Sequence, residues 1–233
     1  MYGLAHPRSK SFFACGDYNQ RLTTWGTRTP EQMRWVCADL QTREVNIAYR
    51  QSRQLNDLST AIIDLTGGTK PKVSLPPEVD SEGVSPALVE NASGRGTIDW
   101  LAKRIIEVES LVRQLPSIAI FVPSETQVQP LAQALNYALQ EQNIRVVPCP
   151  NGQVVGHQNE VRVFDVQHIK GLEFEAVFFV DLDQLAEQTA DLFPSYLYVG
   201  STRAATYLGI TCRTSLPPLL TPIKSSFTSH WKS

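Results

Sequence analysis

The chain has 233 residues, 42% of them hydrophobic, and a formal net charge of −2. This is enough apolar sequence for a buried core, and the near-neutral charge excludes nucleic-acid binding through an overall basic field, so any such contact must lie in a local groove. The four cysteines are scattered without C-x-x-C spacing, which indicates reduced thiols, no zinc site and a cytoplasmic location. No apolar run is long enough to predict a membrane span.

The N-terminal part contains a short apolar run, residues 11–15, that predicts a strand. Gly16-Asp17-Tyr18-Asn19-Gln20 follows it and favours a turn, because Gly and Asn suit turn positions. Trp25 comes five residues later, and on composition alone it would be a core or interface tryptophan. Thr29 and Pro30 then predict the start of a helix that extends to Leu40.

A second segment, residues 45–52, reads as a strand end carrying Tyr49 and Arg50. A Tyr-Arg pair at a strand end is also a common structural edge pair. An amphipathic helix is predicted from this segment to about Leu65, and residues 67–96, rich in Gly, Pro, Ser and Glu, predict a long surface excursion.

The middle of the chain alternates between helix and strand. Apolar periodicity predicts helices over residues 96–114 and 126–142, and short apolar runs predict strands over 118–122 and 144–147. This alternation predicts an α/β fold with a parallel sheet flanked by helices.

Residues 161–180 carry two continuous apolar runs, 161–166 and 176–180, which predict central strands buried on both faces. For the polar loop between them, the structural alternative is a solvated turn in which Gly171 supplies an unusual backbone angle. Farther on, residues 197–208 predict a helix that carries Arg203, followed by a strand from Ile210. Asp181 and Asp183 read as loop or helix-cap residues.

Four short motifs carry a resemblance to a known family. K-G-L-E-F at 170–174 and Y-V-G-S-T-R-A at 198–204 resemble the fifth and sixth motifs of UvrD/Rep-type superfamily 1 DNA helicases. G-D-Y-N-Q at 16–20 resembles their third motif, and A-Y-R-Q-S at 48–52 resembles the fourth, usually N-Y-R-S. The blocks are scattered between Phe12 and Cys212 and point to the C-terminal, second RecA-like part of such a helicase, a P-loop NTPase-type fold without its P-loop half.

The resemblance implies roles around ATP. Arg203 and Arg50 would be arginine fingers on the γ-phosphate, where a guanidinium meets the charge that spreads in phosphoryl transfer, and Gln20 would link that phosphate to DNA. Tyr49 would stack on adenine, Glu173 would accept bonds from the ribose, and Gly171 belongs to the same loop. The alternative for Arg203 is an ion pair within its own domain.

It also implies contacts with single-stranded DNA. Trp25 matches the aromatic residue that stacks on a base, which needs only a π-face and no sequence readout. Gln167 and Lys170 would meet the strand, although Lys170 could equally line the loop. The family threonine is replaced by Asp165, which is unfavourable near phosphates unless its carboxylate points away or holds a neighbouring group.

No G-x-x-x-x-G-K-[ST] occurs, nor a D-E-x-Q before Gly16. We therefore expect ATP and Mg²⁺ to be held largely by an N-terminal RecA-like domain of the same protein, with no metal ligands in this chain. Residues 1–29 would be a remnant of that first domain and residues 30–233 the second domain. Because only residues 148–160 separate the preceding strand from Val161, no large accessory insertion is expected.

The resulting expectation is a motor that hydrolyses ATP and moves on single-stranded DNA when complete, while this chain alone is inactive. One alternative is a stand-alone RecA-like module that binds a protein or DNA without catalysis. Another is a helicase that works beside a nuclease. The sequence contains no metal-binding cluster of carboxylates that would support this alternative.

Overall fold

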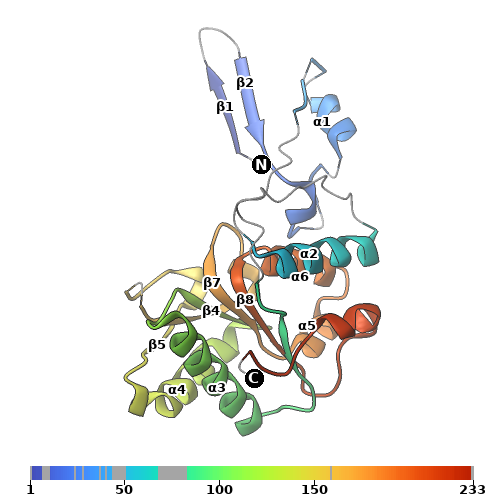
Figure 1. The fold of residues 1–233 in the computed structure, drawn as a ribbon. Coiled ribbons are helices and arrows are strands. Elements are labelled where there is room, and N and C mark those ends of the chain that lie inside the picture. Colours follow the sequence, from blue (N-terminus) through green and yellow to red (C-terminus); the bar gives the residue numbers. More distant parts are fainter. Residues whose placement is uncertain are drawn as a thin grey trace.

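The main feature of the computed structural model is one six-stranded, all-parallel sheet with helices on both faces (Figure 1). The structure describes residues 2–6, 11–23, 25–27, 29–36, 38–39, 41–43, 51–67, 83–157 and 159–231. The strand order is β3-β8-β7-β4-β6-β5. The strands are β3 (Ala87–Val89), β4 (Ile118–Val122), β5 (Val146–Pro148), β6 (Val161–Asp165), β7 (Phe174–Phe179) and β8 (Ala204–Thr211). The predicted α/β class is therefore confirmed.

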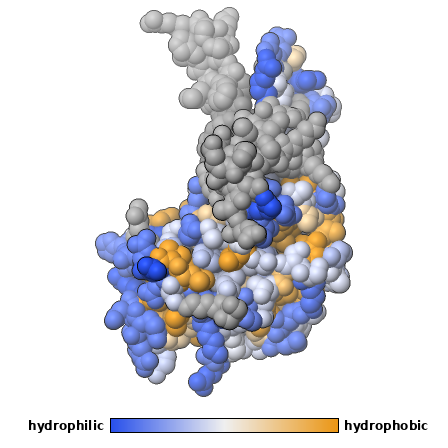
Figure 2. All heavy atoms as spheres, in the orientation of Figure 1, coloured by the Kyte–Doolittle hydropathy of each residue, from blue (hydrophilic) through white to orange (hydrophobic). Residues whose placement is uncertain are grey.

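Two helices cover one face of the sheet, and three cover the other. α3 (Arg95–Val112) and α4 (Glu125–Ala138) pack on the side chains of Ile118, Ile120 and Val122. α2 (Arg53–Thr66), α5 (Leu182–Gln188) and α6 (Phe193–Ser201) pack on the face that carries Ala119 and Phe121. Successive side chains of β4 point alternately into the cores on the two faces of the sheet, which is why this strand is apolar at every position. Hydrophilic residues dominate the outer sides of α3 and α4 (Figure 2).

Aromatic rings fill the core beneath α2 and α6. Phe121 stacks on Phe164 of β6 with ring centroids 5.7 Å apart, and it contacts Phe179 of β7 at 6.0 Å. These three strands are neighbours in the sheet, so their rings form one layer. Gly200 of α6 lies directly over this layer, because a Cβ there would come within 1.8 Å of Phe179 Cζ.

The N-terminal part forms a separate small unit in Figure 1. β1 (Tyr2–His6) and β2 (Ser11–Cys15) pair antiparallel, and a 3₁₀ helix, η1 (Tyr18–Gln20), packs against α6. The helix predicted from Pro30 is present as α1 (Pro30–Val36), shorter than expected, and the Thr29 hydroxyl accepts the N–H of Gln32 as an N-cap. Sequence patterns did not predict β1.

A C-terminal segment covers the edge of the sheet that β3 forms. η6 (Pro218–Ser226) packs near α2, and Thr228 bridges to Ala87 of β3 in parallel. Trp231 then packs against Phe178 and Tyr207. The strand β3 and this covering segment were not predicted, since residues 67–96 read as an excursion.

Candidate functional site

Arg203 lies in the turn between α6 and β8, so its predicted place on a helix is wrong. α6 ends at Ser201 and β8 begins at Ala204. The reason is that Thr206, Tyr207 and Ile210 favour a strand, and pairing with β7 and β3 outweighs the helical reading of the local pattern. Arg203 is therefore held at the amino-terminal edge of the sheet.

Arg203 as a whole residue is 7% exposed, and its guanidinium reaches three different parts of the chain. Its Nε donates to the Val199 carbonyl at 3.2 Å and Nη1 donates to the Leu172 carbonyl at 3.4 Å. Its Nη2 donates to Oε1 of Gln20 at 2.8 Å, across 183 positions of sequence. The third-motif and sixth-motif residues picked from the sequence thus meet directly.

A second contact holds η1 against α6. The Tyr198 hydroxyl donates to Oδ2 of Asp17 at 3.3 Å. Burial, and next the negative charge of Asp17, hold the pKa of Tyr198 well above its usual value. The protonated hydroxyl of Tyr198 is thus the donor and the carboxylate of Asp17 the acceptor in this contact.

The segment before α2 is fastened to the backbone on either side of Arg203. Nε2 of Gln51 donates to the carbonyls of Ser201 and Ala204, at 2.8 and 3.2 Å, and the Ser52 N–H donates to the Ala205 carbonyl at 2.9 Å. Tyr49 and Arg50, the predicted adenine-stacking residue and second finger, lie outside the described residues.

The fifth-motif loop crosses from the carboxyl end of β6 to the amino end of β7 without an α-helix. It begins with a 3₁₀ helix, η5 (Val166–His168), and Val166 and Ile169 are fully buried against the core. Gly171 has φ = 82°, a left-handed angle that a side chain would strain. The loop returns to Arg203, because the Phe174 N–H donates to the Arg203 carbonyl at 3.0 Å.

Gln167, predicted to contact DNA, and Glu173, predicted to contact the ATP ribose, lie at different ends of their strands. Gln167 follows the carboxyl end of β6, whereas Glu173 precedes the amino end of β7, and in a parallel sheet these ends lie at opposite edges. Gln167, Lys170 and Glu173 are all exposed. Trp25 is 76% exposed, which excludes a place in the core of the chain and leaves the ring accessible for stacking or for an interface.

Asp165 is buried and holds a neighbouring backbone group. It is 3% exposed, and its Oδ1 accepts the Gln167 N–H at 2.8 Å, capping η5. Burial raises the pKa of this carboxyl, against the smaller opposing effect of the Gln167 N–H. The carboxylate is thus a structural cap that is desolvated when charged.

Because its pKa is raised in the folded protein, Asp165 should make the protein less stable as pH rises through that pKa. Asp165→Asn keeps the accepting oxygen and removes the charge, so we expect the variant to be more stable than the wild type at pH 8, with the difference shrinking toward pH 4. Urea unfolding at both pH values measures this. Asp57→Asn, at an exposed position on α2, is the control and should show no such pH-dependent gain; an equal gain there, or none at Asp165, contradicts the prediction.

Asp181 occupies the predicted cap position, before α5 and without a side-chain cap bond, whereas Asp183 lies inside α5 and not in a loop. Asp181 pairs with Nε of Arg213 at 2.7 Å, at the start of α5. Asp183 accepts the backbone N–H groups of Arg213 and Thr214. Within the described ranges, no group of three or more His, Cys, Asp or Glu side chains could hold a metal ion, and no helix is long and apolar enough to cross a membrane.

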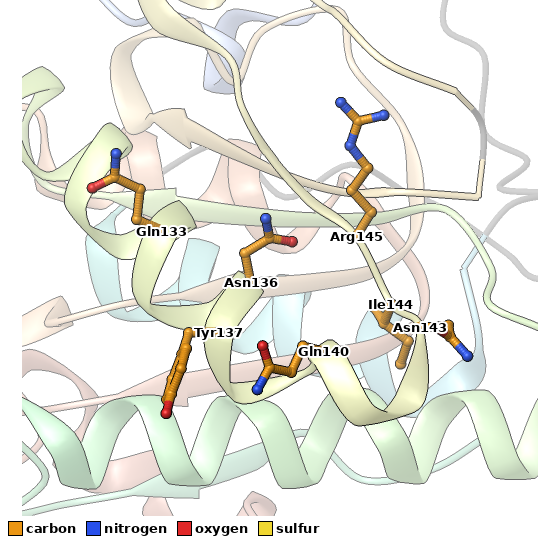
Figure 3. Close-up of a pocket in the computed structure, with 7 residues that line it drawn as sticks. All are labelled: Gln133, Asn136, Tyr137, Gln140, Asn143, Ile144 and Arg145. Carbon is orange, nitrogen blue, oxygen red and sulfur yellow. The ribbon is translucent and has the colours of Figure 1, made fainter.

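Two hollows lie away from Arg203. One, of about 470 Å³, contains amide side chains from the end of α4 (Figure 3), among them Asn136, whose Oδ1 accepts the Val146 N–H. Arg145, which also lines this hollow, pairs with Glu160. Asn136 and Arg145 therefore both help to hold β5 in place. The other, about 1050 Å³ and mostly apolar, lies between α3 and α4. Neither contains a predicted site residue.

Sequence reasoning missed three residues that build the site. Asp17 and Tyr198 lie inside the quoted motifs, so their positions were a usable signal for a contact between those motifs. Gln51 was noted only as a departure from the fourth motif, and nothing local indicates that its carboxamide spans the Arg203 turn.

A parallel sheet covered by helices on both faces, with an arginine at a helix-to-strand turn facing a separate loop, defines a RecA-like α/β domain. Residues 160–211 match the sequence profile of the UvrD-like helicase C-terminal domain. This stretch is therefore similar in sequence to that family, which confirms the resemblance predicted from the fifth and sixth motifs.

The structural comparison agrees on the fold. The C-terminal domain of a possible DNA helicase from Lactobacillus plantarum is similar over 78% of this chain and 98% of that one, with a TM-score of 0.58 and 22% identity. At that identity the likeness establishes the fold alone. The large terminase of a thermophilic bacteriophage aligns over 70% of this chain and 39% of its own at 14% identity, with a TM-score of 0.35, too low to carry an argument. No curated protein matches the sequence significantly.

Proposed function

We propose that the chain is the second motor domain of an ATP-dependent DNA helicase or translocase of UvrD type. The observation that carries the proposal is the hydrogen bond between Arg203 and Gln20. It places a guanidinium and a carboxamide from two separate motifs at one point, where both can turn to a phosphate group.

The residues present suit a triphosphate. Gln20 presents a neutral amide that both donates and accepts, so its bond to Arg203 can be exchanged for bonds to phosphate oxygens. The planar Arg203 fork is suited to two such oxygens, and Glu173, exposed one residue before β7, is suited to ribose hydroxyls. Arg50 is adjacent in sequence to Gln51, which bonds the carbonyls on either side of the Arg203 turn. We propose that Arg50 acts beside Arg203 and that Tyr49 stacks on the adenine ring.

ATP and Mg²⁺ are proposed to be held mainly by an N-terminal RecA-like domain, of which residues 1–29 would be the last part. Bound there, ATP would supply the phosphoryl group and Mg²⁺ the charge neutralisation for its transfer. This chain would position Arg203 and Gln20 at the γ-phosphate. Trp25, exposed near η1, would stack on a base of single-stranded DNA, and Gln167 and Lys170 would contact the strand farther along.

The second candidate is a RecA-like module that binds DNA or a protein without catalysis. The exposure of Trp25 favours it as much as it favours a motor, since stacking alone holds single strands. Turnover separates the two candidates.

The test is ATP hydrolysis stimulated by single-stranded DNA, measured for this chain alone and for a polypeptide that joins it to its P-loop domain. We expect no turnover from the chain alone and single-strand-dependent turnover from the joined protein. Single-strand binding without turnover in the joined protein would support the non-catalytic module instead.

A further inference from the structure

Gln51 is buried at the point where α2 approaches the Arg203 turn, 7% exposed and with its amide nitrogen shared between two carbonyls. The carbonyls belong to Ser201, the last residue of α6, and Ala204, the first of β8. The carboxamide therefore closes the end of the helix and fixes the start of the strand at once. Only two residues, Thr202 and Arg203, lie between its two acceptors.

The surrounding contacts form a buried polar seam between residues 51–59 and 201–205. The Ser52 N–H donates to the Ala205 carbonyl, and the hydroxyls of Ser59 and Ser201 lie 3.2 Å apart. In a low-dielectric interior such bonds are directional and costly to leave unmade, so they specify one conformation where apolar packing would allow several. The conformation specified here is that of the turn carrying Arg203.

We infer that Gln51 is a positioning residue for Arg203: it sets the backbone of the Ser201–Ala204 turn and thereby aims the guanidinium at Gln20. The inference rests on the proposed function for its consequence in turnover, but not for its structural content. A methionine at position 51 would keep the length of the side chain without the donor. An asparagine would keep the amide one methylene too short to span both carbonyls.

The structural readout uses the 233-residue chain. In nitrogen-15 spectra the Arg203 Nε–H, assigned from its loss in Arg203→Lys, should be protected from solvent exchange by its bond to Val199. We expect Gln51→Met and Gln51→Asn each to lower this protection on the order of tenfold. The matched control is Gln127→Met, which removes a side-chain bond between α4 and Gln184 and should leave Arg203 unchanged. Unchanged protection in both Gln51 variants, or an equal fall in the control, overturns the inference.

The functional readout uses the polypeptide joined to its P-loop domain. Gln51→Met should lower kcat roughly tenfold while KM for ATP changes little, because misplacing a group that acts in the transition state costs turnover and not ground-state binding. In a protein that already carries Arg203→Ala, Gln51→Met should not lower kcat further, because both substitutions remove the same contribution of Arg203. An additive loss contradicts the inference. Wild-type turnover in Arg203→Ala instead refutes the proposed function and leaves the exchange measurement to decide the role of Gln51.

Discussion

Replacing Arg203 by alanine is expected to lower single-strand-stimulated ATP turnover by about 10³-fold or more in the protein that contains both motor domains. The guanidinium already lies at an edge of the sheet, aimed at Gln20 by bonds to the Val199 and Leu172 carbonyls. Little reorganisation would be needed for it to stabilise charge developing on phosphate oxygens. Arg203→Lys keeps the charge but loses the planar fork, so its turnover should fall between those of the wild type and the alanine variant.

The control for this experiment is Arg95→Ala. The Arg95 side chain is 94% exposed and its nearest carboxylate, Asp99, is 3.8 Å away, so its loss should change neither turnover nor stability noticeably. Thermal unfolding of Arg203→Ala must accompany the assay, because the side chain also holds the fifth-motif loop. Turnover within about threefold of wild type in a folded Arg203→Ala protein would show that Arg203 is not an arginine finger, since such a residue raises kcat at least about 10³-fold.

Replacing Phe121 by alanine is expected to cost about 3–5 kcal/mol of the free energy of unfolding. Phe121 is 1% exposed, on the strand at the middle of the sheet, between the rings of Phe164 and Phe179. Its neighbours belong to strands fixed on both sides by hydrogen bonds, so the cavity cannot collapse easily. Such a loss is a large part of the stability of an ordinary domain.

Urea unfolding followed by circular dichroism measures this loss, with Tyr137→Ala as the control. Tyr137 is a similar aromatic side chain, 76% exposed on α4, and its removal should change the free energy by at most about 0.5 kcal/mol. If Phe121→Ala does not fold, Phe121→Leu, which leaves a smaller cavity, should show the same direction at lower cost. Equal effects of Phe121→Ala and Tyr137→Ala would mean that this aromatic layer is not the core.

Local sequence patterns predicted most elements of the sheet. The β4 strand was predicted at its observed bounds, β6 and β7 were predicted within two residues, and an unusual backbone angle at Gly171 was associated with a solvated turn. These features depend on side-chain periodicity and backbone freedom over a few residues, which a sequence displays directly. The end of α6 was wrong because residues 202–208 continue the helical pattern of α6 while Thr206 and Tyr207 favour a strand, and pairing with β7 and β3 decides for the strand.

For the candidate site, the sequence supplied Gln20 and Arg203 as separate predictions from separate motifs. That they touch is a tertiary fact, as are the contacts of Asp17 with Tyr198 and of Gln51 with the Arg203 turn. No spacing rule connects residues 150 or more positions apart. Of the three missed residues, Gln51 is therefore the one for which no local signal existed.

The sequence by itself determined most of the strands and helices of the main sheet, and it supplied Gln20 and Arg203 as the residues predicted to face a phosphate. The tertiary structure alone decided the strand order, the position of Arg203 between a helix and a strand, and the group to which its guanidinium is aimed. The physical reason is the distance along the chain over which each property is set. Backbone angles and the hydrogen bonds of a helix depend on a few neighbouring residues, whereas the direction of a buried side chain depends on the packing of distant segments against it.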